Sequence, residues 1–341
     1  MQTQTRTYKA FQIETFGLTG LRETTKEIQS PTGTKVLVRM RAASLNYRDL
    51  MAAKGVYSKN LPLPLIPLSD GAGEVVEVGD AVTRWKVGDR VAPIFMQSWI
   101  AGEVNPEIGK SALGGGIDGV LREYGLFDQD GLVAIPEYLS FEEAATLPCA
   151  AVTAWHALVT KGGIKSGDSV LVMGTGGVSI FALQIAKLSG ARVIATSSSD
   201  AKIKKLKELG ASDTINYKEH DDWDRKAVEL TGGRGVDHVV EVGGAGTLDK
   251  SMRAVRMAGY IAMIGVLSGA GSADPRPLLM KTIHLQGIYV GSRAMFEDML
   301  RAFEMHKVRP VIDKTFKAEQ IKEALEYMES GKHFGKIVLT F

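Results

Sequence analysis

Three small residues that follow an apolar run form the pattern that most directly indicates a ligand-binding site. Gly174, Gly176 and Ser179 stand at the spacing G-x-G-x-x-S. In a strand-to-helix turn, the first small residue permits a tight bend, the second lets the backbone approach a pyrophosphate, and the third lets the helix pack on the strand. The helix start also offers unpaired N–H groups to phosphates. We predict that this turn, which includes Gly177 and Val178, holds a dinucleotide; a turn that serves packing alone is the alternative.

The residues that follow the next strand indicate which dinucleotide is bound. An NAD site usually places Asp or Glu about 20 residues after the turn, where it accepts from the ribose hydroxyls. Here Ser197, Ser198 and Ser199 hold that place, and Asp200 is better explained as charge in the first turn of the next helix. Hydroxyl groups and the nearby Lys202 suit a 2′-phosphate, so the sequence predicts NADP rather than NAD. The alternative is a plain serine loop beside a solvated lysine.

Composition sets the broad class of the protein. The chain has 341 residues, enough for about two domains, with 45% hydrophobic and 23% charged residues. A net charge of +2 implies neither nucleic acid nor an anionic membrane as partner. The single cysteine, Cys149, allows no intrachain disulfide and suits a reducing compartment. Residues 1–11 lack a signal-peptide pattern and no uninterrupted apolar run reaches the roughly 18 residues of a membrane span, so we expect a cytoplasmic protein.

The elements that must position these residues change character near Ser140. Before it, strands are expected at 35–41, 73–79 and 87–92, and the Gly-rich stretch 97–118 is expected to be a long surface loop. From Ser140, which together with Glu143 forms a capping-box pattern, a helix is expected to about Leu158. The part of the chain before Ser140 is therefore predicted to form a β-rich domain.

Strands and helices then alternate in the pattern of a doubly wound parallel sheet. The expected strands are 169–173, 191–196, 213–216, 236–242, 260–264 and 283–289, and the expected helices are 177–188, 200–209, 222–231 and 247–257. Helices at 294–306 and 318–330 and a strand at 336–340 break the alternation, so we expect them to return to the first domain. The predicted fold class is α/β, with a Rossmann dinucleotide-binding domain at 151–293 and a β-rich domain at 1–150 and 294–341.

Further motifs resemble those of the medium-chain dehydrogenase/reductase superfamily, which contains zinc alcohol dehydrogenases and zinc-free quinone oxidoreductases. Besides the glycine turn, the resemblance rests on residues 44–50, 70–79, 87–91, 144–155 and 335–339, in that order along nearly the whole chain. It implies that the β-rich domain is a GroES-like catalytic domain.

The resemblance also implies that the chain binds no metal. Asn46 stands where zinc-containing members have a cysteine ligand, Ser69 stands where they have histidine, and only Cys149 matches a ligand. Zinc requires three N, S or O donors from the protein in a catalytic site. Residues 93–118 contain no cysteine, so the structural zinc site is also missing. Cys149 is then expected to be a small buried residue beside the nicotinamide end.

Without zinc, the resemblance indicates a reductase that delivers hydride from NADPH to an enone, a quinone or a related small carbonyl compound. The negative charge that develops on the substrate oxygen then needs a hydrogen-bond donor. The candidates are the Asn46 amide, Tyr47, Tyr57 and the cofactor ribose hydroxyl, and Asp49 is a candidate for pairing with a cation inside the fold. A purely structural turn is the alternative for Asn46, and packing or ion pairing is the alternative for Tyr47 and Arg48.

Other positions are assigned to the cofactor by resemblance. Lys202 and Tyr217 match residues that flank the 2′-phosphate in quinone oxidoreductases, and Thr153 matches a threonine near the nicotinamide. Strand ends and the C-terminal segment complete the expected set: Val242, Gly265, Val266, Leu267, Tyr289, Val290, Gly291, Phe334 and Lys336. A solvated charge is the alternative for Lys336.

Three hypotheses about activity and one about assembly remain open. Besides the reductase, the chain fits a zinc-free alcohol dehydrogenase-like enzyme or a non-catalytic NADPH-binding protein with a structural or redox-sensing role. The apolar run 283–290 is expected to form an edge strand, which pairs across a two-fold axis in the family, so we predict a homodimer. Met96 and Trp99 suggest a pocket wall, a lid or a dimer contact.

Overall fold

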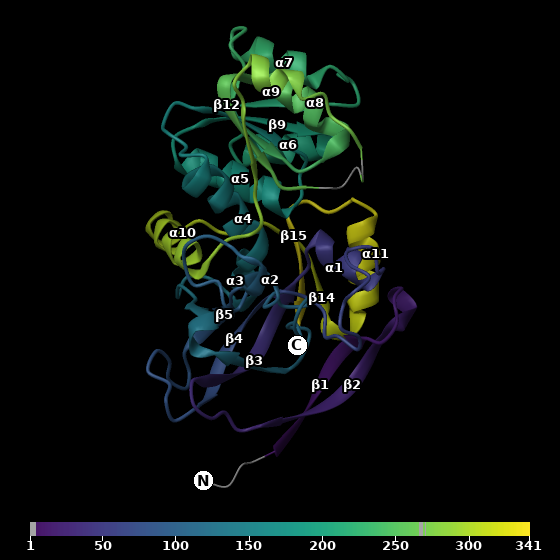
Figure 1. The fold of residues 1–341 in the computed structure, drawn as a ribbon, viewed down its shortest axis with the longest axis vertical. Helices are drawn as coiled ribbons and strands as arrows, with labels where there is room; N and C mark the ends of the chain where they lie inside the picture. The colour runs from purple at the N-terminus through teal and green to yellow at the C-terminus, as the bar shows by residue number, and fades with distance from the viewer. Residues whose placement is uncertain (1–4, 266–268, 270) are drawn as a thin grey trace. The chain divides into compact units, whose positions relative to one another are not determined.

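The chain forms two compact units in the computed structural model, which describes residues 5–265, 269 and 271–341 (Figure 1). Unit 1 contains residues 1–150 and 291–341, and unit 2 contains residues 151–290. The second division lies three residues before the expected 293/294 boundary. The C-terminal elements lie in unit 1.

Unit 2 is a parallel six-stranded sheet with helices against it. The strand order is β10-β9-β8-β11-β12-β13, and every pairing is parallel. The strands are β8 (Ser169–Met173), β9 (Arg192–Ser197), β10 (Asp213–Asn216), β11 (Val236–Glu241), β12 (Val255–Met263) and β13 (His284–Gly287). The helices are α4 (Val152–Trp155), α5 (Gly177–Leu188), α6 (Asp200–Glu208), α7 (Trp223–Leu230), α8 (Ala245–Ala254) and α9 (Arg276–Met280). The order reverses between β8 and β11, so a topological switch point lies at the ends of these two strands.

The Rossmann prediction is confirmed, with two local corrections. All five residues of β8 and all six of β11 are buried, as expected of central strands covered on both faces. The helix expected at 247–257 ends at Ala254, because Val255 is already extended and pairs with Val236 of β11. The strand expected at 283–289 is limited to β13, which forms the edge of the sheet.

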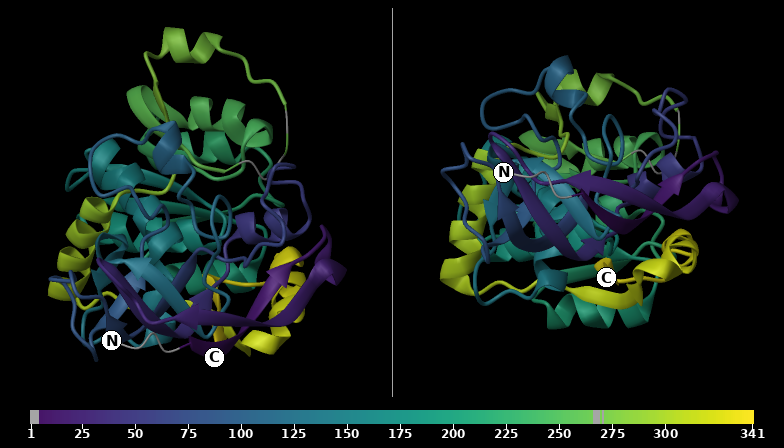
Figure 2. Two further views of the ribbon diagram at one scale, coloured as in Figure 1. Left: turned by 60° about the horizontal axis from the view of Figure 1, so that its bottom comes forward. Right: turned by 90° about the horizontal axis from the view of Figure 1, so that it is seen from below.

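Unit 1 is a β-rich body around a largely antiparallel sheet. The order is β14-β15-β3-β4-β5-β7, with β6 paired to β3, while β1 and β2 form a separate hairpin, drawn in purple in Figure 2. The strands are β1 (Thr5–Ile13), β2 (Leu21–Gln29), β3 (Lys35–Ser44), β4 (Asp70–Val78), β5 (Arg90–Pro93), β6 (Tyr124–Asp128), β7 (Leu132–Ala134), β14 (Ile312–Lys317) and β15 (Lys336–Thr340). The strand expected at 87–92 starts only at Arg90, because Gly88 has φ 92° and forms a turn.

Helices and a packed loop complete unit 1. The helices are α1 (Tyr47–Ala53), α2 (Pro106–Gly109), α3 (Phe141–Ala145), α10 (Arg293–His306) and α11 (Ile321–Glu329). The stretch expected to be a surface loop at 97–118 is irregular apart from α2, but it is not simply a solvent loop. Trp99 and Leu113 are each 1% exposed, because apolar side chains in this stretch turn inward.

The helix expected from 141 to 158 is helical but not uniform. It begins as predicted, with Glu143 N–H donating to Ser140 Oγ and Ser140 N–H donating to the Glu143 carboxylate. After α3, wide π-helical turns at Leu147–Ala151 and His156–Lys161 flank α4. Such wide turns occur most often near functional sites, and Cys149 and Thr153 lie within this segment.

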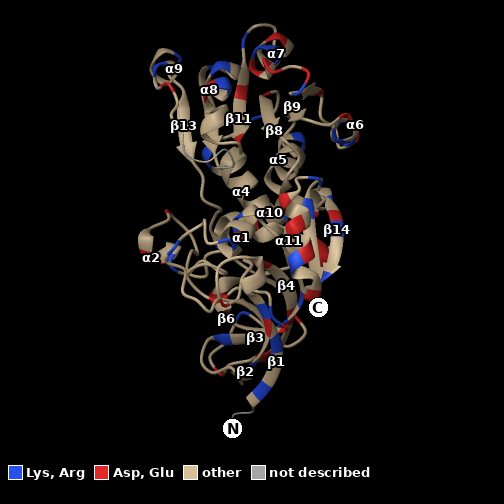
Figure 3. Ribbon diagram, turned by 90° about the vertical axis from the view of Figure 1, so that its right-hand side faces the viewer, with Lys and Arg blue, Asp and Glu red and all other residues tan. Residues whose placement is uncertain are grey.

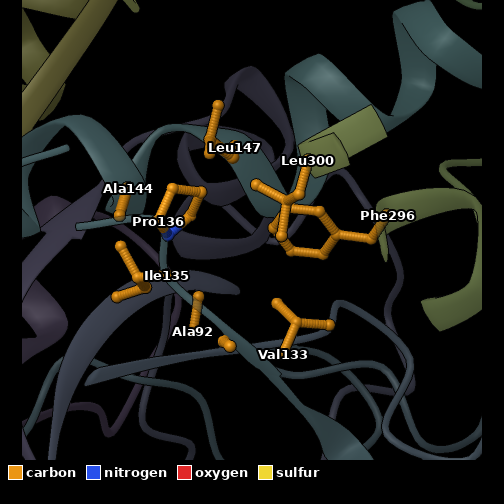
Figure 4. A pocket seen from close by; sticks show the side chains of 9 residues that line it. Ala92, Val133, Ile135, Pro136, Ala144, Leu147, Phe296 and Leu300 are labelled. Carbon is orange, nitrogen blue, oxygen red and sulfur yellow. The ribbon is translucent and has the colours of Figure 1, made fainter. Parts of the chain in front are cut away.

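An apolar crevice in unit 1 serves packing rather than binding. It is lined by residues of β5, β7, α3, α10 and the segments next to them, and Phe296 and Leu300 of α10 point into it (Figure 4). The crevice has no room for a water molecule, so it is a seam between α10 and the sheet.

Basic and acidic residues are interspersed along α11 and β14 in the ribbon of Figure 3. In the described part of the chain, none of the helices combines the length and apolarity needed to cross a membrane.

Candidate functional site

The glycine turn of unit 2 joins β8 to α5 at the switch point. Gly174 has φ 72°, a left-handed conformation that favours glycine, and Gly176 is the N-cap of α5. A Cβ atom built at either glycine would meet nothing within 4 Å. Gly176 has no side chain to occupy the first N–H groups of the helix. Open space in front of free helix-terminal donors fits the pyrophosphate of a dinucleotide.

Two hydrogen bonds hold this turn rigid. Ser179, which replaces the third glycine of the pattern, is 2% exposed and its hydroxyl donates to Met173 O at 2.7 Å. Gly174 N–H donates to Thr196 O at 3.0 Å, which ties the turn to the end of β9. Serine therefore fits against the strand as the sequence argument expected, and also bonds to it.

The predicted phosphate-recognition residues come together at the neighbouring strand ends. Tyr217 N–H donates to Ser197 O at 3.0 Å, and the Tyr217 side chain is 40% exposed. Ser197 is buried, Ser198 is partly exposed, and Lys202 lies partly exposed in the first turn of α6.

Asp200, the carboxylate closest in sequence to these residues, is already bonded elsewhere. Its Oδ1 accepts from Asn216 Nδ2 at 2.9 Å, and it lies in the first turn of α6 as expected. Both observations fit a side chain that organises the end of β10 and the start of α6.

A buried carboxylate that the sequence analysis did not single out holds the end of β11. Glu241 is 0% exposed, and its Oε1 accepts from the N–H groups of Gly243 at 2.7 Å and Gly244 at 3.0 Å. The same oxygen accepts from the Thr247 hydroxyl at 2.6 Å, and the other oxygen accepts from the Ser251 hydroxyl. Glu241 thereby fixes the loop that contains Val242. An acidic residue at the end of an apolar strand, two residues before a pair of glycines, was the signal available in the sequence.

The predicted cofactor positions Gly265 and Val290, which follow strands β12 and β13, are fixed by close contacts. A Cβ atom on Gly265 would lie 1.7 Å from Val242 O, so the two loops touch through backbone. Val290 has a left-handed φ of 53°, and its carbonyl oxygen lies 2.7 Å from His156 Nδ1. Burial lowers the pKa of His156, which keeps this imidazole neutral near pH 7.

The other predicted cofactor positions differ in exposure. Thr153 is buried in α4, Tyr289 is 43% exposed, and Gly291 and Phe334 are buried within unit 1. Val266 and Leu267 lie outside the described residues.

Unit 1 brings together four residues named in the sequence analysis and a further carboxylate, Asp70, in a group that we call the polar centre: Asn46, Ser69, Asp70, Cys149 and Lys336. Sheet pairing explains the assembly, because Ser44 at the end of β3 pairs with Asp70 of β4 and with Val338 of β15. Residues that are far apart in sequence therefore meet at one edge of three adjacent strands.

Lys336 contacts two other members of the polar centre. Its Nζ donates to Leu45 O and to Asn46 Oδ1, each at 2.6 Å, and lies 3.9 Å from Asp70 Oδ2. Lys336 is 3% exposed and Asp70 is 0% exposed. The alternative of a solvated lysine is therefore wrong.

Two buried carboxylates flank Asn46. Asp70 accepts from Ser69 Oγ at 2.7 Å and from Cys149 N–H at 3.1 Å, and burial raises its pKa against the opposing charge of Lys336. Asp49 accepts from Asn46 N–H at 2.8 Å and lies 3.5 Å from Arg48, as the expected internal ion pair. Burial raises the pKa of Asp49 to about 6.

The donor set of the polar centre does not fit zinc. Burial, followed by the charge of Asp70, raises the pKa of the Cys149 thiol, so it stays protonated at neutral pH. Asn46 and Ser69 offer an amide and a hydroxyl, and the Lys336 ammonium would repel a metal ion. Among residues 5–265, 269 and 271–341, no group of three His, Cys, Asp or Glu side chains could hold a metal. Cys149 is also partly exposed rather than fully buried as expected.

The two residues after Asn46 have different roles. Tyr47 is 46% exposed and remains available to solvent or substrate. Arg48 packs between the rings of Tyr57, at 5.0 Å, and Phe95, at 4.8 Å, and donates to Leu113 O at 2.9 Å. The structural interpretation is therefore correct for Arg48, which ties the irregular stretch 97–118 to α1.

Comparison with known families identifies both parts of the chain. Residues 32–137 match the profile described as alcohol dehydrogenase GroES-like domain, and residues 177–305 match the profile described as zinc-binding dehydrogenase. The first lies in the β-rich unit, and the second begins at the first residue of α5.

Several relatives match over nearly the full length. A zinc-type alcohol dehydrogenase-like protein of Schizosaccharomyces pombe is 46% identical over 312 residues, or 89% of this chain and 90% of the relative. A crystal structure from Sinorhizobium meliloti 1021, provisionally named alcohol dehydrogenase, has a TM-score of 0.91 and 41% identity and covers 98% of this chain and 99% of its own. The structure of an NAD-dependent alcohol dehydrogenase has a TM-score of 0.89 and 34% identity, with the same coverages.

More distant relatives carry the names of other reductases. An acryloyl-coenzyme A reductase of Metallosphaera sedula is 29% identical over 92% of this chain and 95% of its own length. A quinone oxidoreductase of Homo sapiens is 28% identical over 91% of this chain and 90% of its own length.

Proposed function

This chain belongs to the medium-chain dehydrogenase/reductase superfamily of oxidoreductases, and we propose that it is a zinc-independent, NADPH-dependent reductase of enones, quinones or related carbonyl compounds. The observation that carries the proposal is the polar centre, where an amide and a hydroxyl stand in place of metal ligands beside a buried ammonium group. The names of the acryloyl-coenzyme A reductase and the quinone oxidoreductase support this class of acceptor.

Unit 2 holds the cofactor in this proposal. The backbone at Gly174 and Gly176 and the N–H groups at the start of α5 bind the pyrophosphate. Ser197, Lys202 and Tyr217 surround the 2′-phosphate, and no carboxylate ends β9 to repel it. When bound, NADPH supplies the hydride.

Unit 1 supplies the stabilisation of charge. As hydride reaches the β-carbon of an enone, negative charge builds on the carbonyl oxygen, and a donor aimed at that oxygen lowers the barrier. The Asn46 amide is the donor in this proposal, with Tyr47 as the second candidate. Addition of a proton from solvent at the α-carbon completes the reduction.

Two other functions fit the same fold. An alcohol dehydrogenase-like enzyme is favoured by the names of the Schizosaccharomyces pombe relative and of the NAD-dependent structure. Oxidation of a simple alcohol, with no reduction of conjugated acceptors, would support it. A non-catalytic role would be supported by tight NADPH binding without turnover of any acceptor.

The proposed assembly is a homodimer formed at β13. All four residues of this edge strand are exposed, including Leu285 at 39%, and the apolar Leu279 and Met280, which precede the strand, are 81% and 76% exposed. An unpaired strand edge with apolar neighbours favours pairing with a second copy. We further propose that the protein works in the cytoplasm on small molecules. Light scattering of wild type and Leu285→Lys checks the dimer, which the charged variant should dissociate.

The deciding experiment follows NADPH absorbance during incubation with a panel of quinones, enones and aldehydes. We expect turnover of conjugated acceptors with NADPH, weaker turnover with NADH, and no loss of activity after treatment with a chelator. Loss of activity on chelation would contradict the metal-free proposal, and a preference for NADH would contradict the assignment of Ser197, Lys202 and Tyr217.

A further inference from the structure

We propose that Lys336 is a positioning residue that decides which end of the Asn46 amide faces the substrate. The inference rests on the proposed function, because it concerns the group that stabilises the substrate oxygen. It moves Lys336 from the expected cofactor contacts to the control of a hydrogen-bond donor in unit 1.

The chemistry of lysine fixes the amide orientation. An ammonium group can only donate hydrogen bonds, whereas an asparagine amide has an accepting oxygen and a donating NH₂. The atom 2.6 Å from Lys336 Nζ is therefore the amide oxygen of Asn46. If the Asn46 amide turned by half a rotation, its NH₂ group would face the ammonium group of Lys336. The buried ammonium would then lose one of its acceptors. Such a loss is costly for a charged group.

The other side of the amide is held by a second contact. Asn46 Nδ2 lies 3.4 Å from Ser69 Oγ, and the Ser69 hydroxyl donates to Asp70 Oδ1 at 2.7 Å. Asp70 lies 3.9 Å from Lys336 Nζ, so the chain of contacts closes into a ring. Each member of the ring donates to the next one: Lys336 donates to Asn46, Asn46 to Ser69, and Ser69 to Asp70.

Exposure shows where this ring can meet a ligand. Lys336, Ser69 and Asp70 are 3%, 0% and 0% exposed, whereas Asn46 is partly exposed. The NH₂ group of Asn46 faces Ser69 Oγ at 3.4 Å and also interacts with the carboxylate of Asp70, and it belongs to the one partly exposed member of the ring. In this proposal, that NH₂ group is the donor that turns to a developing oxyanion on the substrate.

The buried pair of Lys336 and Asp70 is also a poor means of stabilising a fold. Burying an ammonium and a carboxylate removes both ions from water at a large cost in desolvation, and apolar residues of similar volume often stabilise a protein equally well. A charge pair retained at 3.9 Å, with an amide between its members, is better explained by the orientation that it imposes.

The test compares three variants with a matched control. Lys336→Met removes the donor, Lys336→Arg keeps a positive charge and N–H donors, and Asn46→Asp keeps an acceptor for Lys336 but removes the NH₂ group. Lys332→Met is the control, because Lys332 is exposed on the same segment. With the acceptor that wild type reduces fastest, we expect kcat to fall about 100-fold in Lys336→Met and Asn46→Asp. Lys336→Arg should retain more activity, and the control should match wild type.

The split between kinetic constants separates positioning from other roles. We expect the KM for NADPH to stay within about twofold of wild type, because the ring stabilises charge only in the transition state. A rise in the NADPH KM of Lys336→Met with unchanged kcat would place Lys336 at the cofactor and overturn the inference, while the proposed function would stand. Full activity in Asn46→Asp would overturn it as well.

A second measurement does not require turnover. It still tests the inference when a variant has lost activity because it folds poorly, or when the enzyme reduces none of the acceptors. In ¹⁵N-labelled wild type, the side-chain NH₂ of Asn46 should give two sharp, well-separated proton signals. Lys336→Met should bring them together or broaden them, and Lys332→Met should not. Unchanged signals in Lys336→Met would show that the lysine does not hold the amide. Absence of turnover in wild type alone would refute the proposed function, and the NMR signals would then decide the role of Lys336.

Discussion

The glycine turn of unit 2 and the polar centre of unit 1 are built in opposite ways. The turn lies within residues 174–179 and works through backbone N–H groups, a left-handed glycine and open space. The polar centre works through side chains that β3, β4, β15 and the segment after α3 bring together. A site made of backbone tolerates many side chains but few backbone changes, whereas a site made of side chains depends on each partner. The following predictions, from the largest expected effect to the smallest, test this comparison.

The largest effect should come from the one side chain on which the backbone of unit 2 depends. Glu241→Leu would leave the N–H groups of Gly243 and Gly244 and two hydroxyl groups without their acceptor. We expect a loss of about 3–5 kcal/mol in the free energy of unfolding. Denaturant titration measures it, with Asp249→Leu in the following helix, where only the bond from Asp274 N–H is lost, as the comparison. A loss below about 1 kcal/mol would show that the loop does not need this carboxylate.

A side chain added to the turn should block the cofactor without harming the fold. Gly176 has φ −75° and a Cβ there meets nothing within 4 Å, so Gly176→Val should fold normally. We expect the Kd for NADPH to rise about 100-fold, because valine would fill the pyrophosphate space. Fluorescence titration measures binding, and thermal unfolding of the free protein serves as the control. Unchanged affinity would remove the turn from the cofactor site.

Reversal of charge at α6 should change the choice of cofactor. Lys202→Glu should raise the KM for NADPH by about 10-fold or more and leave the KM for NADH within about twofold, because only NADPH carries the 2′-phosphate. Lys204→Glu, at an exposed position of the same helix, is the matched control. Equal effects on both cofactors would place Lys202 away from the phosphate.

The last prediction concerns the pH dependence of stability beside the polar centre, where the effect of each single pH step is the smallest. The pKa of Asp49 is raised from 3.8 to about 6 in the folded protein, so the folded state holds this proton more tightly than the unfolded state. Its contribution to stability therefore increases as pH falls from 6 towards 4, by up to about 1.4 kcal/mol per pH unit. Asp49→Asn should remove this slope in denaturant titrations at pH 4, 5 and 6. An identical slope in the variant would assign it to another group.

The two regions also differ in how well the sequence revealed them. β8, α5 and β10 were predicted with the bounds they have, because apolar periodicity and the glycine turn are local signals. The end of α8 was missed because Val255 to Met257 continue a plausible helical pattern, and only pairing with β11 makes them a strand. The wide π-helical turns at 147–151 and 156–161 left no signal in residue type.

The polar centre was predicted only in pieces. Asn46, Ser69 and Cys149 were identified through the family resemblance, and Asp49 was expected to pair with a cation, as it does with Arg48. The bond between Lys336 and Asn46 joins residues at opposite ends of the chain, and no local pattern reports such a contact. A lysine at the start of a strand is most often solvated, so the sequence could not distinguish a solvated Lys336 from a buried one. The structure shows that it is buried where β15 pairs with β3.

The enclosure of Lys336 has a consequence for chemical labelling. Reagents that acylate or alkylate amino groups act on amines that water can reach. At 3% exposure, Lys336 should stay unmodified in the folded protein while lysines such as Lys332 react. Mass spectrometry of a labelled digest can therefore report, through this one residue, whether the sheet of unit 1 has opened.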